Sequence, residues 1–136
     1  MRFMVIVNGC QDEKPPTQEF LAAMGKYNEE LTRAGVFLAL EGLSKASTGT
    51  RVRFAGKKPI VTDGPFAESK ELIGGYWLWK CKSKQEAIEW LKRAPFDGGE
   101  EVEIRRVFEV EDFGENATPE IREQEQRLRA QAANKK

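Results

Sequence analysis

The chain has 136 residues, and its hydrophobic content of 40% is enough for the core of one domain. Its 22 basic and 22 acidic residues cancel, whereas a nucleic-acid-binding protein usually carries a basic surplus, so we expect no nucleic-acid partner. No apolar run approaches the ~20 residues that cross a bilayer, and the N-terminal apolar segment is too short for a signal peptide, so we expect a cytoplasmic protein without a membrane partner.

The first part of the chain predicts a strand, a helix and a second strand. Residues 2–8, RFMVIVN, form an apolar run rich in β-branched residues, which is typical of a buried strand. We expect Thr17 to cap a helix that ends at Gly35, because only glycine readily adopts the left-handed conformation found there. Residues 36–43, VFLALEGL, predict the second strand, with Glu41 as its one charge. The apolar stripe of the helix consists of Phe20, Met24, Tyr27 and Leu31.

The middle of the chain predicts a hairpin, a turn and the most apolar strand. Residues 51–55 and 58–62 flank the pair Gly56-Lys57, which is typical of a hairpin turn. The turn DGPF over residues 63–66 follows, and residues 72–80, LIGGYWLWK, predict a strand. The two glycines of that strand indicate a bulge or the close approach of another backbone, since the segment is no nucleotide-binding fingerprint.

A second helix and an edge strand complete the predicted sheet. Ser83 and Glu86 form an S-x-x-E capping box, and Pro95 stops the helix that the box opens. Residues 101–109 alternate in part between apolar and charged side chains, which indicates a half-buried strand near a sheet edge.

The C-terminal segment differs in composition from the rest. Thr118-Pro119 predicts the start of a helix, but Ile121 and Leu128 are its only bulky apolar residues. We therefore expect one domain over residues 1–113 and a polar helical tail over residues 114–136. The tail is either a solvated appendage or a lid that packs lightly on a partner.

The order strand, helix, strand, strand, helix, strand predicts an α+β ferredoxin-like split βαβ fold, with both helices on one face of an antiparallel sheet. The strands carry apolar residues at both odd and even positions, so both faces of the sheet are apolar. In the first strand, Val5 and Val7 point one way, while Met4 and Ile6 point the other. A sheet with one solvated face would alternate apolar and polar residues. The second face therefore needs a cover, and we predict a homodimer, as in dimeric α/β barrels. Such a dimer would leave a cavity for a small-molecule ligand, either between the sheet and the partner or between the sheet and the predicted hairpin.

Residues 63–76, DGPFAESKELIGGY, closely resemble the signature of the YCII-related family, in its DGPF-containing branch. Supporting stretches are AGVFLALEGL at 34–43, VTDGPF at 61–66 and EVEIRRV at 101–107, so the resemblance covers roughly residues 2–109. It implies a ferredoxin-like dimeric α/β barrel. It also implies a small-molecule enzyme or binder, although most members have no established activity.

The resemblance carries two further implications. Some relatives look like ring-modifying dehalogenases or isomerases that use a His–Asp pair, a mechanism that a chain without histidine cannot share. DGPF proteins are also often encoded beside alternative sigma factors. This association gives the alternative prediction, a protein-interaction accessory to transcription that acts through residues 115–136.

The lack of histidine excludes Ser-His-Asp and Cys-His nucleophile systems, and no metal-ligand or phosphate-loop spacing is present, so we expect no metal or cofactor. Carboxylates can still exchange protons, and we predict Glu41 and Asp63 as catalytic candidates. Structural roles compete with both predictions. Asp63 would equally cap its turn, and Glu41 would equally pair with Arg51 or Arg53.

Aromatic and cationic side chains give the predicted ligand-binding set. Aromatic side chains supply apolar contact area, and a phenol adds a polar group, although half of them should simply be core or dimer interface. Arginine and lysine can hold a ligand carboxylate, although surface solvation is the competing interpretation. The predicted set consists of Phe66, Tyr76, Trp77 and Arg53, with Trp79 and Lys70 as further members.

The two cysteines, Cys10 and Cys81, lie far apart in sequence and outside any CxxC pattern, which is typical of free thiols in a reducing compartment. We interpret Cys81, at the end of a strand, as a packing residue rather than a nucleophile.

Overall fold

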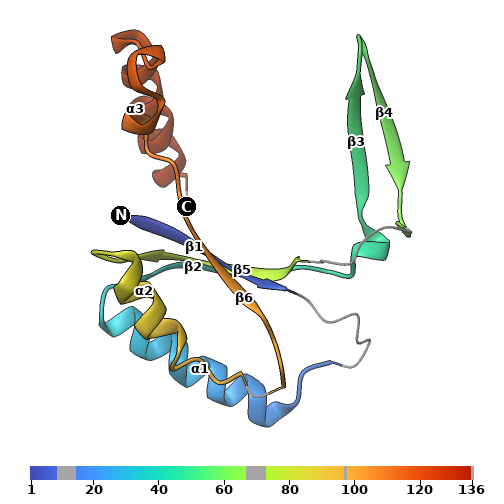
Figure 1. Cartoon of the computed structure of the whole chain (residues 1–136), viewed down its shortest axis with the longest axis vertical. Coiled ribbons are helices and arrows are strands. Elements are labelled where there is room, and N and C mark those ends of the chain that lie inside the picture. The colour runs from blue at the N-terminus through green and yellow to red at the C-terminus, as the bar shows by residue number, and fades with distance from the viewer. Residues whose placement is uncertain (9–14, 67–72, 97, 136) are drawn as a thin grey trace. The chain divides into compact units, whose positions relative to one another are not determined.

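The computed structural model describes residues 1–8, 15–66, 73–96 and 98–135, so predictions for Cys10 and Lys70 lie outside the described residues. The chain divides into two compact units, residues 1–106 and residues 107–136, drawn in Figure 1.

The first unit contains a four-stranded antiparallel sheet, as predicted for an α+β fold. Its strands are β1 (Arg2–Asn8), β2 (Phe37–Gly42), β5 (Ile73–Lys80) and β6 (Val102–Arg106). They lie in the order β2-β5-β1-β6, with antiparallel pairing at every junction. The most apolar strands, β1 and β5, are therefore central, and β6 lies at an edge as its alternating charges predict.

Helix α1 (Gln18–Arg33) begins and ends at the predicted residues. The Thr17 hydroxyl accepts a hydrogen bond from the Phe20 backbone N–H at 3.1 Å, which satisfies one of the free donors of the first turn. Gly35 follows the helix with a φ of 75°, the left-handed conformation expected there. The predicted stripe faces the sheet, and its members Tyr27 and Leu31 are buried.

Helix α2 (Lys84–Leu91) carries a modified form of the predicted capping box. The Ser83 hydroxyl accepts from the Glu86 backbone N–H at 3.1 Å. The Glu86 carboxylate accepts from the backbone N–H of Lys82 at 2.7 Å, one residue before the usual recipient. Both bonds together hold the chain as it leaves β5 and enters α2.

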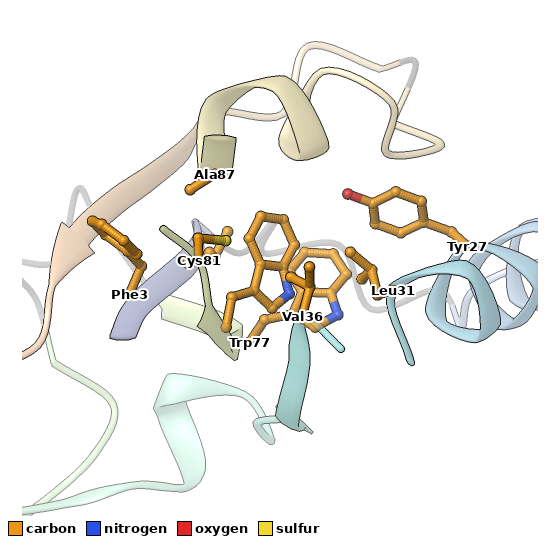
Figure 2. Close-up of a cluster of buried hydrophobic side chains, with 9 residues drawn as sticks. Phe3, Tyr27, Leu31, Val36, Trp77, Cys81 and Ala87 are labelled. Atoms are coloured by element: carbon orange, nitrogen blue, oxygen red, sulfur yellow. The ribbon is translucent and has the colours of Figure 1, made fainter. Parts of the chain in front are cut away.

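Both helices pack on one face of the sheet, and Figure 2 shows the aromatic centre of this core. The rings of Trp77 and Trp79 lie with their centroids 5.5 Å apart, and Phe3 packs beside them from β1. The Tyr27 hydroxyl donates to the Trp90 carbonyl at 2.5 Å, which joins α1 to the end of α2. Burial raises the pKa of this hydroxyl above its ordinary value of 10.0.

The predicted hairpin is present as β3 (Thr50–Ala55) and β4 (Lys58–Asp63), and these two strands form a sheet of their own. Gly56, at the turn, has a φ of 65°, which a residue with a side chain rarely adopts. The short 3₁₀ helix η1 (Ala46–Thr48) precedes the hairpin. Every residue of both hairpin strands is exposed.

The second unit contains the 3₁₀ segment η2 (Val110–Asn116) and helix α3 (Pro119–Ala133). The Thr118 hydroxyl accepts from the Ile121 backbone N–H at 3.3 Å, which confirms the predicted helix start. Glu125 and Arg129, which lie four residues apart on α3, form an ion pair at 2.7 Å. No residue of α3 is buried, in keeping with the few apolar residues it carries.

Candidate functional site

The face of the four-stranded sheet that points away from α1 and α2, here called the outer face, is apolar at its centre and charged at its edges. Side chains on paired positions of neighbouring strands point to the same face, so the strand register defines rows across the sheet. Met4, Tyr76 and Leu78 are half-buried and Ile6 is buried, while the side chains on the two edge strands reach solvent. One row consists of Glu41, Tyr76, Ile6 and Glu103, and the next consists of Ala39, Leu78, Met4 and Arg105.

Glu41 and Tyr76 are direct cross-strand partners on the outer face. Residues in this relation have Cβ atoms about 5 Å apart, so the carboxylate and the ring are neighbours. Glu41 is exposed and Tyr76 is half-buried. The pair therefore places a proton acceptor beside a hydroxyl that both donates and accepts, at the border of an apolar surface.

The close pairing of β2 and β5 depends on a glycine. A Cβ atom added at Gly75 would lie 2.8 Å from the Glu41 carbonyl oxygen, closer than side-chain carbons approach in proteins. The register also shifts by one residue between Val7 and Asn8, opposite Gly74. The structure confirms the interpretation of the two glycines as a bulge and a close backbone approach.

Trp77 was predicted to bind a ligand beside Tyr76, but it lies on the opposite face of the sheet. The residue is 1% exposed within the helix-covered core (Figure 2). Its indole N–H donates to the Asn28 side-chain oxygen at 2.9 Å. Trp79 is likewise fully buried there. Strand geometry is the reason, since successive side chains point to opposite faces. Trp77 is a core residue and has no part in the outer face.

Asp63 and Phe66 lie at the foot of the hairpin. The Asp63 carboxylate accepts a hydrogen bond from the Thr50 hydroxyl at 2.7 Å, and this contact joins the first and last residues of the hairpin. The Arg51 guanidinium lies 3.8 Å from the centroid of the Phe66 ring, a cation–π contact. Asp63 thus contacts a side chain across the hairpin, which differs from the turn cap that competed with catalysis in the sequence interpretation.

The remaining predicted cation, Arg53, lies on β3 at a position that pairs with Ile60. The structure thus places two of the predicted site residues, Glu41 and Tyr76, side by side on the sheet. Three others, Arg53, Asp63 and Phe66, belong to the hairpin and its foot.

Sequence reasoning missed Glu103 and Arg105 as parts of the outer face. They occupy alternate positions of β6, and the Arg105 Nε lies 3.5 Å from a Glu103 carboxylate oxygen. The alternation along residues 101–107 does place them on one side of a strand. The alternation alone does not show that β6 pairs with β1, and only this pairing brings Glu103 and Arg105 beside the apolar centre of the outer face.

Other chemistry receives no support from the described residues. They contain no group of three side chains suited to hold a metal ion. Burial raises the pKa of the Cys81 thiol to about 11, so the thiol stays protonated near neutral pH and is a poor nucleophile. In the described part of the chain, no helix combines the length and apolar character needed to span a membrane.

Comparison with known proteins agrees with the resemblance in the sequence. Residues 1–111 match a family model described as the YCII-related domain. An uncharacterised protein of Rhizobium meliloti is 29% identical over 82 residues, which is 60% of this chain. The match spans 63% of that protein, less than two thirds of its length.

Proposed function

We propose, starting from the fact that this chain belongs to the YCII-related family, that the outer face of its sheet is a small-molecule site closed by a second copy of the chain. The order of elements around the sheet supports a ferredoxin-like split βαβ fold, and the DGPF turn supports the DGPF branch. A pair of such sheets meeting face to face is the dimeric α/β barrel expected from the sequence.

The observation that carries this proposal is the row formed by Glu41, Tyr76, Ile6 and Glu103. Its centre is apolar, as in most small-molecule sites, and its polar groups are few and lie at the border. Burying the surface that the half-buried central side chains still expose would stabilise a dimer by about 1 kcal/mol for each of them, before the entropy cost of association.

The chemistry of the row defines the ligand class. Two carboxylates border the apolar centre in this row, and the Tyr76 hydroxyl lies next to one of them. A small aromatic molecule that carries a hydroxyl or an amine would place its ring on the apolar centre and donate its proton to Glu41. The same placement suits Glu41 to act as a general base, with Tyr76 as a positioning residue. Asp63, already bound to Thr50, has a structural role in this proposal.

Thermal unfolding in the presence of phenol, aniline and benzoate tests the ligand class. We expect phenol and aniline to raise the Tm of the dimer, and benzoate to raise it less, because its carboxylate would face Glu41. Glu41→Gln removes this repulsion and should narrow the difference between benzoate and the two donors.

Glu29→Gln is the matched control, because it removes the same charge from an exposed position on α1. The control should keep the ranking of the parent chain. Two results would contradict the proposed site: a parent chain whose Tm responds to none of the three probes, or a difference in Tm between benzoate and the two donors that Glu41→Gln leaves as large as in the parent chain.

A further inference from the structure

The outer face carries opposite charges toward the two ends of its strands. Arg2 and Lys80 are paired residues of β1 and β5, and alternation along both strands places them on the outer face. They lie four residues along the strands from the row that contains Glu41 and Glu103, a distance of about 13 Å. We name the rows, in order along the strands, the carboxylate row (Glu41, Tyr76, Ile6 and Glu103), the central row (Ala39, Leu78, Met4 and Arg105) and the cation row (Lys80 and Arg2).

A second copy that covers this face removes water from these charges. Glu41, Glu103 and Lys80 are exposed in a single copy. A carboxylate or an ammonium group that loses its water needs a partner of opposite charge, because an unpaired buried charge is strongly destabilising. The second copy therefore has to lie in an orientation that pairs carboxylates with cations.

Two symmetric orientations keep the strands of the facing sheets aligned. With the two-fold axis parallel to the strands, each row faces the same row of the other copy, so that Glu41 faces Glu103 and Lys80 faces Arg2. With the axis across the strands, over the central row, each carboxylate row faces the cation row of the other copy. Arg105 contacts Glu103 of its own chain at 3.5 Å, so its charge is partly compensated in both orientations. The charge pattern favours the second orientation, because the first places like charges together at both ends of the sheet.

The second orientation brings a cation to the proposed site. An axis across the strands places β5 of one copy over β5 of the other, and residues 76 and 80 lie at equal distances on either side of Leu78. Lys80 of the second copy then lies over Tyr76, one strand away from Glu41. Neighbouring strands are about 4.8 Å apart and facing sheets about 10 Å apart, so the two long side chains can meet between the sheets.

We propose that the second copy lies on the outer face with its strands reversed end for end, and that Lys80 of each copy completes the site of the other beside Glu41 and Tyr76. This inference rests on the proposed function, because it names the residue that the second copy contributes to the same site. An ionised carboxylate accepts several hydrogen bonds, so Glu41 can bind the ammonium group and the proton of a ligand hydroxyl together. Lys80 of the second copy thus supplies the counter-charge of Glu41 and leaves its contact with the ligand open.

Crosslinking between copies tests the orientation. The background variant is Cys10→Ser with Cys81→Ala, so that only introduced thiols react. One copy then carries Glu41→Cys and the other carries Lys80→Cys, and the mixture is treated with a short bismaleimide. We expect a mixed dimer, identified by mass spectrometry of the linked peptides.

The matched control for crosslinking replaces Lys80→Cys by Glu103→Cys. The reversed orientation places residues 41 and 103 at opposite edges and opposite ends of the facing sheets, so this mixture should give little product. A yield with Glu103→Cys that equals or exceeds the yield with Lys80→Cys would overturn the proposed orientation.

Charge reversal tests the proposed pair independently, because the two orientations predict changes of opposite sign. In the reversed orientation Glu41→Lys and Lys80→Glu each place like charges together, so each should weaken dimerisation by about tenfold or more. The double variant restores opposite charges and should return the dissociation constant to near the parent value. Glu29→Lys, at an exposed position on α1, is the control and should leave dimerisation unchanged. Sedimentation equilibrium measures all four dissociation constants.

The outcomes separate failure of this inference from failure of the proposed function. Single reversals that leave dimerisation unchanged or strengthen it, or a double variant no better than the single ones, overturn the orientation. If Leu78→Lys still dissociates that dimer, the outer face remains the interface and the proposed function stands. A dimer that Leu78→Lys leaves intact, or a parent chain that stays monomeric, overturns both.

Discussion

Neighbouring residues of β5 have opposite environments. Tyr76 lies on the outer face opposite Glu41, whereas Trp77 lies in the core and donates to Asn28. Both are aromatic and both looked like pocket residues in the sequence. Only alternate residues of this strand can take part in the proposed site, and the glycine before Tyr76 allows β2 to come close enough to form it.

Gly75→Ala should lower the free energy of unfolding by about 1–3 kcal/mol, the range for overpacking a close contact. The added methyl group would meet the Glu41 carbonyl oxygen at 2.8 Å, and backbone cannot move aside cheaply. Gly25→Ala is the control, because Gly25 lies within α1 with nothing within 4 Å of an added Cβ atom. It should stabilise the chain by up to about 1 kcal/mol. Urea unfolding of the two variants measures both effects, and equal stabilities would contradict the account of Gly75.

The stability of the fold should fall at alkaline pH. Burial raises the pKa of Cys81 from its ordinary value of 9.0 to about 11, so folding favours the protonated thiol. The resulting stabilisation is fully present below pH 9 and is lost as the pH rises towards 11. Tyr27, whose pKa is also raised by burial, adds to the loss at the upper end.

Unfolding measured between pH 7 and pH 11 checks this expectation. Cys81→Ala removes the titrating thiol, so its stability should fall less steeply between pH 9 and pH 11 than that of the parent. A steeper fall for Cys81→Ala would contradict the assignment.

At the scale of elements, local signals predicted most of the fold. Thr17, Ser83 and Thr118 each accept a hydrogen bond from the residue three positions later, as cap chemistry predicts. Such signals depend only on residues that lie a few positions apart in the sequence, so they can be recognised without the structure.

The partners within the outer face could not be predicted in this way. The register of β2 against β5 shifts between Phe37 and Ala39. After this shift, each residue of β2 points to the face opposite to the one that simple alternation predicts. Simple alternation from Phe37, which faces the core, would put Glu41 in the core as well. Instead Glu41 pairs with Tyr76 on the outer face. A bulge of this kind depends on contacts between strands, and the spacing of residues does not reveal it.

Removing the helix caps should have effects that depend on which helix is capped. Thr17→Ala and Ser83→Ala should each lower the free energy of unfolding of the first unit by about 1 kcal/mol, because both caps belong to helices that contribute to its core. Thr118→Ala removes the same kind of hydrogen bond from α3, which has no buried residue. It should lower only the helix content measured by circular dichroism. An equal loss of stability in all three variants would contradict the separation of the two units.

At the scale of the whole molecule, the outer face and the hairpin of β3 and β4 share one physical property. Each exposes aligned apolar side chains that a single copy leaves partly or wholly in solvent. A zero net charge removes the long-range repulsion that would keep two copies apart. Burial of the outer face against a second copy in a symmetric dimer is the arrangement that we propose for it.

The predicted alternative, an accessory to transcription acting through residues 115–136, stays a prediction. Deletion of residues 115–136 tests it directly. If the tail serves an interaction of that kind, the deletion should abolish capture of a purified sigma factor while leaving dimerisation intact. Capture by the truncated chain equal to that of the full chain would count against it.

Sedimentation equilibrium of the full chain at micromolar concentration tests the central claim most directly. A second copy on the outer face predicts a species of twice the chain mass of 15.4 kDa, reduced to the single mass by Leu78→Lys, which places a charge at the centre of the proposed interface. A parent chain that sediments at the single mass, or a Leu78→Lys variant that still sediments at twice that mass, would contradict the claim.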